Sequence, residues 1–268
     1  MNTNIKTGLL STLLRSHTTL LWSLFALLSL FSSPTWAQSE GGLLLGAEVE
    51  KKLGKQWSVG LEGDFRTRND FKTVDRWSIG AGASYKFTKW LKADAGYVLL
   101  NNNFREKIAE GSSRTKWRPS YWGLRHRVHA SLVADYKVVG NLRLSLRERW
   151  QYTYRAEKSV TRWSLYRNSM TSSLDEDYVR SGKGKNQLRS RLQAEWDKKR
   201  ALLTPFASIE LYNSWSIEKI RYTVGTDIRL NKQHSLSAFY RFQDMRNIDE
   251  EDYDPDMHYL GLGYKFKF

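Results

Sequence analysis

Apolar and polar residues alternate with a period of two along the last ten residues of the chain. Leu260, Leu262, Tyr264, Phe266 and Phe268 occupy every second position, and glycine, lysine and one tyrosine fill the positions between them. Successive side chains of a β-strand point to opposite faces, so the pattern predicts a strand with one apolar face and one small or charged face. A last strand that ends on an exposed aromatic residue is typical of an outer-membrane β-barrel.

The same alternation recurs in ten earlier segments. They cover approximately residues 43–50, 57–65, 77–87, 91–99, 122–136, 142–154, 188–196, 207–211, 220–230 and 236–242. Short alternating segments separated by turns are the signature of a membrane-spanning barrel. We therefore predict an all-β fold, a transmembrane antiparallel up-and-down β-barrel. Single-chain bacterial barrels have an even strand number, so the eleven segments predict 10 to 12 strands, with one segment merged, split or outside the wall.

Short and long connections alternate between these segments. The short ones lie near Gly54, Thr88, Gly140, Lys198 and Asn231, and the long ones cover about residues 67–76, 101–120, 155–186, 213–219 and 247–258. Short periplasmic turns and long external loops are usual in such barrels. Tryptophans near segment ends indicate interfacial girdles; they are Trp57, Trp77, Trp90, Trp122, Trp150 and Trp196.

The N-terminal residues have the organisation of an export signal. Lys6 and Arg15 are basic, residues 19–31 are mostly apolar, and small and polar residues follow up to Ala37. The apolar run is shorter than the ~20 residues that a spanning helix needs. We expect a cleavable signal peptide at residues 1–37, a barrel domain at residues 38–268, and export to the outer membrane of a Gram-negative cell.

Composition restricts the remaining classes. The chain has no cysteine, which excludes disulfides, a thiolate metal site and an acylated lipoprotein. A mean hydropathy of −0.60 indicates that the chain is not a helical membrane protein. It is compatible with a barrel, because the apolar residues of each barrel strand alternate with polar ones. The net charge of +15 is strongly basic, but the arginines alternate along the segments instead of forming a patch. We therefore expect no nucleic-acid partner, and we predict no cofactor and no metal site.

Charged residues occupy the positions that alternate with the apolar face and are predicted to line the barrel lumen. The candidates are Arg125, Arg127, His129, Arg143, Arg147, Arg149, Arg189, Arg191, Glu48, Glu50, Glu62 and Asp64. Two interpretations stay open. The charges pair across a narrow lumen and fill it, or a surplus of arginines forms a narrow channel for small anionic solutes.

Specific cross-strand neighbours follow from the expected turns. The turn at residues 139–140 predicts Asp135 opposite Arg143 and His129 opposite Arg149. The turn near Lys198 predicts Arg189 opposite Glu210. If the barrel closes between its first and last segments, we expect Lys265 and Lys267 to face Glu48 and Glu50.

Two residues break the pattern, since His126 and Glu148 fall on the face predicted to meet lipid. A charge at the bilayer midplane is costly. We expect either a β-bulge that inverts the register or a place near the membrane interface.

An enzyme remains the rival class, namely a lipid or peptide hydrolase with its site at the external rim. The histidines after residue 37 are His126, His129, His234 and His258. None of them belongs to a recognisable catalytic motif, so we predict no enzymatic activity. The acid-rich residues 249–256 lack the spacing of a calcium-binding EF-hand loop and are interpreted as a solvated external loop.

Three resemblances support the barrel. The opening residues 46–53 and 57–66, the motif Arg125-His126-Arg127 and the motif Leu146-Arg147-Glu148-Arg149 resemble an uncharacterised family of Gram-negative outer-membrane barrels, a domain of unknown function. The arginine ladder is more weakly similar to small porins for acidic oligosaccharides. The last strand resembles the signal for the barrel-assembly machinery, a partner that we expect to bind the strand ending at Phe268. Outer-membrane lipid and lipopolysaccharide are the other expected partners. The basic residues 101–120 suit lipopolysaccharide phosphates or an acidic polysaccharide, but a solvated loop is the favoured interpretation of them.

Overall fold

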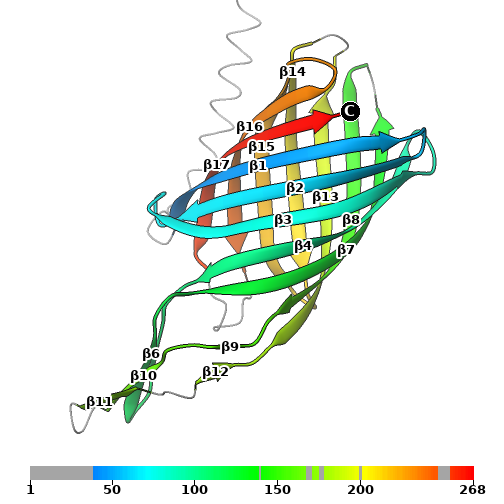
Figure 1. Ribbon diagram of the computed structural model, residues 1–268. Coiled ribbons are helices and arrows are strands. Elements are labelled where there is room, and N and C mark those ends of the chain that lie inside the picture. The colour runs from blue at the N-terminus through cyan, green and yellow to red at the C-terminus, as the bar shows by residue number, and fades with distance from the viewer. Residues whose placement is uncertain (1–38, 139, 167–170, 175–177, 199–200, 247–253) are drawn as a thin grey trace, which may run out of the picture. The chain divides into compact units, whose positions relative to one another are not determined.

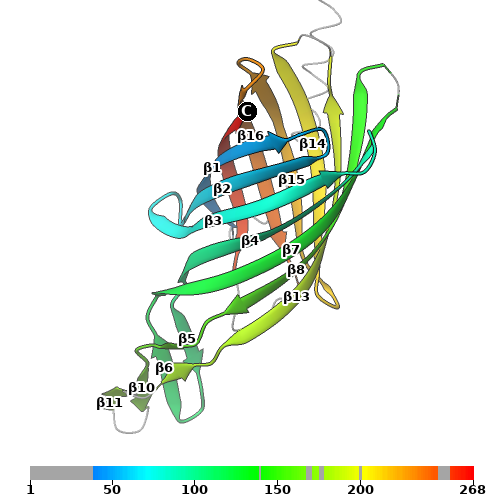
Figure 2. The same ribbon diagram turned by 45° about the vertical axis from the view of Figure 1, so that its right-hand side comes forward.

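The computed structural model describes residues 39–138, 140–166, 171–174, 178–198, 201–246 and 254–268, and these form β-strands and their connections. Eleven strands of this part of the chain close into one barrel (Figure 1; Figure 2). In barrel order they are β1 (Ser39–Leu53), β2 (Trp57–Arg68), β3 (Thr73–Lys86), β4 (Leu91–Phe104), β7 (Tyr121–Lys137), β8 (Leu142–Arg155), β13 (Lys183–Trp196), β14 (Leu203–Asn213), β15 (Ile217–Arg229), β16 (His234–Met245) and β17 (Asp256–Lys267). Strands that follow one another in this order pair antiparallel, which confirms the predicted fold class.

The first and last strands close the barrel in parallel. The N–H group of Phe268 donates to the carbonyl of Glu50, and the N–H group of Lys52 donates to the carbonyl of Phe268, both at 3.0 Å. In a parallel ladder, one residue bonds two residues of the neighbouring strand that are two positions apart, and Phe268 bonds Glu50 and Lys52 in this way. The arrows of β1 and β17 accordingly point the same way in Figure 1. The expected even strand number is therefore wrong for the described residues, because a parallel seam lets an odd number close.

Side-chain chemistry across the wall is the reverse of that in a water-soluble protein. On β17, Leu260 is 56% exposed, whereas its neighbour Tyr259 is 3% exposed. On β13, Leu188 is 45% exposed, whereas the side chain of Arg189 is 12% exposed. The apolar face thus points outward and the polar face points into the barrel, as the alternation predicts. The six tryptophans expected in girdles are all on the exposed face, although Trp150 lies in the middle of β8.

The two ends of the barrel differ in their connections. One end, called the short-turn end, carries the turns after β1, β3, β7, β13 and β15 together with Phe268. The other, called the long-loop end, carries Ser39 and the connections after β2, β4, β8, β14 and β16. Two expected long connections are wrong, because β2 and β3 are separated only by residues 69–72, and β14 and β15 only by residues 214–216.

The connections after β4 and β8 fold into strands of their own. A four-stranded sheet has the order β11-β10-β6-β5, and β9 pairs with β12. Both views show them extending beyond the long-loop end (Figure 1; Figure 2). The bounds are β5 (Lys107–Glu110), β6 (Arg114–Arg118), β9 (Lys158–Ser159), β10 (Trp163–Tyr166), β11 (Thr171–Leu174) and β12 (Val179–Arg180). The expected loops at 101–120 and 155–186 are thus partly strand, because Trp117 pairs with both Ile108 and Trp163 in an apolar row.

Some predictions fall on residues that this structure does not describe. They are the signal peptide at residues 1–37 and residues 249–253 of the acid-rich loop. Among the described residues, no helix is long and apolar enough to cross a membrane.

Apolar side chains fill part of the lumen near the seam. Leu44, Met257 and Tyr259 form a buried cluster against which Phe239 packs. Leu100 on β4 is 1% exposed. This filling leaves the polar side chains of the other strands to line the remaining space.

Candidate anion site in the barrel lumen

The predicted lumen-lining residues all stand at positions that alternate with the exposed apolar face. They lie on β1 (Glu48, Glu50), β2 (Glu62, Asp64), β7 (Arg125, Arg127, His129), β8 (Arg143, Arg147, Arg149) and β13 (Arg189, Arg191). The structure distributes them along the barrel axis, so they form several separate groups and not one continuous track.

At the seam, lysines of the last strand meet glutamates of the first. The ammonium group of Lys265 lies 2.5 Å from Glu48 and 3.0 Å from Glu50. Lys267 lies 4.0 Å from Glu50. The expected facing of these lysines and glutamates is therefore confirmed, and the charges lie beside the parallel seam near the short-turn end.

The expected register of the β7–β8 hairpin is wrong by two residues. Asp135 lies opposite Ser145, not opposite Arg143. The turn is centred on Gly140, whose positive φ of 56° allows a reversal later in the chain than expected. The guanidinium of Arg143 instead bonds the carboxylate of Glu195 on β13.

His129 belongs to a buried hydrogen-bonded group with an acidic centre. It lies opposite Gln151 and not, as expected, opposite Arg149. Asp94 accepts hydrogen bonds from Ser131 at 3.0 Å and from Arg149 at 3.1 Å, and its carboxylate lies 3.6 Å from Nε2 of His129. The serine hydroxyl thus donates to the carboxylate and not to the imidazole, an arrangement that differs from a nucleophile–base pair.

A central cluster on the inward face of the adjacent strands β8, β13, β14 and β15 consists of Arg147, Arg189, Glu210, Tyr212 and Arg221. Arg189 lies opposite Tyr212 instead of Glu210 in the backbone register, yet its guanidinium still reaches Glu210 at 2.9 Å. Arg147 contacts the same carboxylate at 2.6 Å, and Tyr212 donates to it at 2.8 Å. Arg221 lies 3.8 Å away and also bonds the hydroxyl of Tyr212. One carboxylate is therefore shared among three guanidinium groups.

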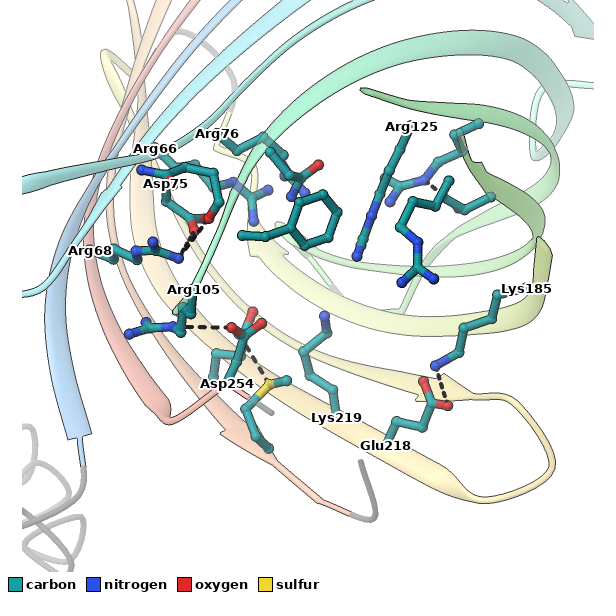
Figure 3. Close-up of a pocket in the computed structure, with 18 of the residues that line it drawn as sticks. Arg66, Arg68, Asp75, Arg76, Arg105, Arg125, Lys185, Glu218, Lys219 and Asp254 are labelled. Carbon is teal, nitrogen blue, oxygen red and sulfur yellow. Dashed lines mark hydrogen bonds and ion pairs between the residues drawn. The ribbon is translucent and has the colours of Figure 1, made fainter. Parts of the chain in front are cut away.

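A cavity of about 490 Å³, called the long-loop cavity, occupies the lumen between this cluster and the long-loop end (Figure 3). Its described lining includes thirteen arginines and lysines against four acids. The basic residues are Arg66, Arg68, Arg76, Arg105, Arg118, Arg125, Arg127, Arg155, Arg221, Lys107, Lys183, Lys185 and Lys219. The acids are Asp75, Glu106, Glu218 and Asp254. The lining thus has nine more basic than acidic groups, and the volume is within the range of small-molecule sites.

Three of the four acids are already engaged by single basic residues (Figure 3). Arg68 lies 3.4 Å from Asp75, Arg105 lies 3.3 Å from Asp254, and Lys185 lies 2.6 Å from Glu218. Each of these three acids thus pairs with one lining cation.

Arg66 and Arg76 stand out among the remaining cations. They lie directly opposite each other on β2 and β3. Within the described chain, neither guanidinium has an ion-pair or side-chain hydrogen-bond partner, and the Nε atom of each is buried without an acceptor. A buried donor without an acceptor is costly, and an anion in the cavity would relieve that cost.

The connection after β4 adds a charge contact between distant segments. Arg105 makes a bidentate contact with Glu40, at 2.7 and 2.8 Å. Burial opposes the charge of Arg105, but Glu40 and then Asp254 outweigh it and raise the pKa of Arg105 above its ordinary value. Burial, and then the nearby carboxylate of Asp75, raise the pKa of Asp254. The raised pKa of Asp254 therefore favours its neutral form, whereas Arg105 keeps its positive charge.

Three histidines lie on the exposed face and bond tyrosine hydroxyls. His126 lies 2.6 Å from the hydroxyl of Tyr97, and His258 lies 2.5 Å from that of Tyr240; His234 lies 2.6 Å from the hydroxyl of Tyr264. The tyrosine in each pair gives a hydrogen-bond partner to a polar ring on the apolar outer face.

The second exception to the pattern is satisfied in the same way. Glu148 accepts a hydrogen bond from Ser190 at 2.6 Å. The register is continuous through both His126 and Glu148, so the expected bulge is wrong at these positions. Local hydrogen-bond partners on adjacent strands, rather than a change of register, accommodate both residues.

Several cavity residues escaped the sequence-based prediction. These residues lie near strand ends. The turn between β2 and β3 is preceded by Arg66 and Arg68 and followed by Arg76, and the first residues of β15 include Lys219 and Arg221. Extending the inward alternation to the ends of these strands would have found Arg66 and Arg221. The bulge between Arg66 and Thr67 changes the alternation there, so Arg68 was not predictable from spacing alone.

The family model described as protein of unknown function (DUF2490) matches residues 41–254, and the chain belongs to this family. The resemblance drawn from the motifs is thereby confirmed. Among solved structures, the chain is similar to the β domain of the Bordetella autotransporter Brka, with 13% identity and a TM-score of 0.50 over 79% of this chain and 83% of that chain. At this identity the similarity concerns the fold alone, that of an outer-membrane β-barrel. No curated protein matches the chain.

Proposed function

We propose that this protein is an outer-membrane barrel that binds small anionic solutes in its long-loop cavity and acts as a narrow channel for them. The observation that carries the proposal is the surplus of nine basic groups around a cavity of about 490 Å³. Guanidinium groups present fixed donors that match carboxylates and phosphates, and lining arginines give pores a preference for anions.

The proposal includes an outer-membrane location with the long-loop end outward. The exposed apolar face, the closed barrel and the aromatic last strand support it. In this orientation, solutes reach the cavity from outside the cell, and Phe268 lies on the periplasmic side, where the barrel-assembly machinery would meet it.

Anion binding is tested first. Refolded protein in detergent is titrated with citrate and inorganic phosphate by calorimetry, with glucose as the neutral probe. We expect citrate to bind with an affinity that falls as salt rises. Replacing Arg66 and Arg76 with glutamine should weaken binding at least several-fold. The matched control Lys55→Gln/Lys89→Gln removes the same charge from exposed short turns and should leave binding unchanged. Equal weakening in both double variants would show that net charge, and not the cavity, attracts the anion.

Transport is tested in planar bilayers. Current steps with a reversal potential that indicates anion preference are expected from the refolded protein, and citrate should reduce the chloride current. The absence of steps above background at both polarities would overturn the channel. A lipid- or peptide-cleaving activity that disappears on replacing His129 or His258 would instead favour the enzyme.

A further inference from the structure

The central cluster separates two cavities in the lumen. Besides the long-loop cavity, a second space of about 220 Å³, called the short-turn cavity, has a lining that includes Arg191, Thr223, Phe239 and Arg241. The linings share no residue, and Arg147, Arg189, Glu210 and Tyr212 line neither. On the adjacent strands β8, β13, β14 and β15, the side chains of the central cluster thus lie between the two linings.

On neighbouring strands, the inward residues on either side of this level line different cavities. On β13, Gln187 lines the long-loop cavity and Arg191 lines the short-turn cavity, with Arg189 between them. On β15, Arg221 lies directly opposite Glu210, and Thr223, the next inward residue, already belongs to the short-turn cavity. The boundary on these strands is therefore a layer of inward side chains at the level of Glu210.

Glu210 is the acid at the centre of that layer. Its side chain is 9% exposed, and those of Arg147, Arg189 and Arg221 are 14%, 12% and 9% exposed. Tyr212 supports the layer, because its hydroxyl donates to Glu210 and its ring lies 4.6 Å from the guanidinium carbons of both Arg189 and Arg221. Three buried guanidinium groups around one carboxylate leave a local excess of positive charge.

We infer that Glu210 is a built-in anion that occupies an internal anion site made by Arg147, Arg189 and Arg221, and that a permeating anion must take its place to pass between the cavities. A carboxylate or phosphate group of the solute satisfies the same guanidinium donors that Glu210 satisfies at rest. This inference rests on the proposed function and names the residue that regulates passage and selects for anions.

The chemistry of the two cavities fits such an exchange. Arg221 lines the long-loop cavity and also reaches the cluster, so an anion bound there lies beside a guanidinium group that holds Glu210. Arg191 and Arg241 receive the anion on the other side, where Arg241 donates to Thr223 at 3.1 Å. A neutral or cationic solute offers nothing that replaces the carboxylate, so the layer stays closed to it.

The decisive experiment compares Glu210→Gln with the wild type in planar bilayers under a salt gradient. Glutamine keeps the shape but removes the internal anion, so we expect a several-fold higher open probability or conductance and a reversal potential further toward the anion value. The matched control is Glu195→Gln, another inward carboxylate, which bonds Arg143 near the short-turn end. It should change the current little.

A second readout detects the vacated site directly. Inorganic phosphate should raise the unfolding temperature of Glu210→Gln more than that of the wild type or of Glu195→Gln, because phosphate fills the place of the carboxylate. If Glu210→Gln does not refold, Tyr212→Phe decides, since it removes the hydroxyl that steadies Glu210 and should increase the frequency of anion current steps.

The possible outcomes separate the two proposals. Citrate binding that depends on Arg66 and Arg76, combined with identical currents and identical phosphate responses in Glu210→Gln and Glu195→Gln, overturns the internal anion and leaves the proposed function standing. Absence of citrate binding to the wild type overturns the proposed function itself.

Discussion

The N–H group of Phe268, the last residue, donates to the carbonyl oxygen of Glu50 on the first strand at 3.0 Å. The carbonyl of Phe268 in turn accepts from Lys52. The C-terminal residue is therefore part of the backbone ladder that closes the barrel, in addition to presenting an exposed ring. This gives the aromatic terminus a structural role that is separate from recognition by any assembly partner.

Deleting Phe268 should destabilise the barrel even when the protein is refolded without any partner. Two backbone hydrogen bonds of the seam are lost, and at about 1 kcal/mol each the free energy of unfolding should fall by about 2 kcal/mol. Urea unfolding in lipid vesicles, followed by tryptophan fluorescence, measures this change.

The substitution Phe268→Leu is the control for that deletion, because it keeps both backbone bonds and removes only the ring. It should be more stable than the deletion in vesicles. Equal stability of the deletion and the wild type in this assay would mean that the seam does not depend on the last residue.

Lys265 should also stabilise the seam through its charge. Lys265 contacts both Glu48 and Glu50 and its side chain is 30% exposed. The change Lys265→Gln should cost about 1–2 kcal/mol of unfolding free energy, between the values for exposed and buried pairs. The double variant Lys265→Gln/Glu50→Gln should cost less than the sum of its single changes in urea unfolding. Strict additivity would contradict a direct interaction.

The sequence predicted these contacts because both strands alternate strictly, which puts their charged residues on one face. It did not predict how the barrel closes. An even strand number is an empirical regularity of bacterial barrels, and nothing in the alternation of β1 shows whether its neighbour is parallel or antiparallel. The hairpin registers also depend on where each turn is centred, and a two-residue error there moved the partner of Asp135 from Arg143 to Ser145.

The sequence predicted that arginines line the lumen, but it did not predict all the residues that form the candidate site. Period-two alternation correctly put Arg125 and Arg127 on the inward face that lines the long-loop cavity. The contributions of Arg105 and Asp254 come from connections, where no period exists. The central cluster depends on diagonal contacts such as that between Arg189 and Glu210, and these require side-chain geometry in addition to register.

The tyrosine partner of His126 should stabilise the exposed apolar face of the barrel. Replacing Tyr97 with phenylalanine leaves the imidazole without the hydroxyl 2.6 Å away. An unsatisfied polar group away from water costs about 1–3 kcal/mol, so the unfolding free energy in vesicles should fall by that amount. The matched control is Tyr136→Phe, because Tyr136 is 70% exposed and its hydroxyl has no partner among the described residues.

A second variant separates the hydrogen bond from packing at this position. Changing both residues, as in Tyr97→Phe/His126→Leu, removes donor and acceptor together and should recover most of the lost stability. If Tyr97→Phe alone behaves like Tyr136→Phe, the contact between Tyr97 and His126 contributes nothing to folding.

The glycines inside the barrel offer a test of how tightly the lumen is filled around the short-turn cavity. A Cβ atom at Gly225 would lie 2.6 Å from the carbonyl oxygen of Ala238 and 2.5 Å from the Cβ of Phe239, so backbone as well as side chain would have to move. At Gly46 on β1 the nearest atom is the flexible carboxylate of Asp64, at 3.3 Å. Overpacking typically costs 1–3 kcal/mol, so Gly225→Ala should lower the unfolding free energy by about that much, while Gly46→Ala should change it by less than about 1 kcal/mol.

Because Phe239 also lines the short-turn cavity, the substitution Gly225→Ala should also reduce the anion current in the Glu210→Gln background. An unchanged current together with lowered stability would show that strand packing at Gly225 is independent of the path through the lumen.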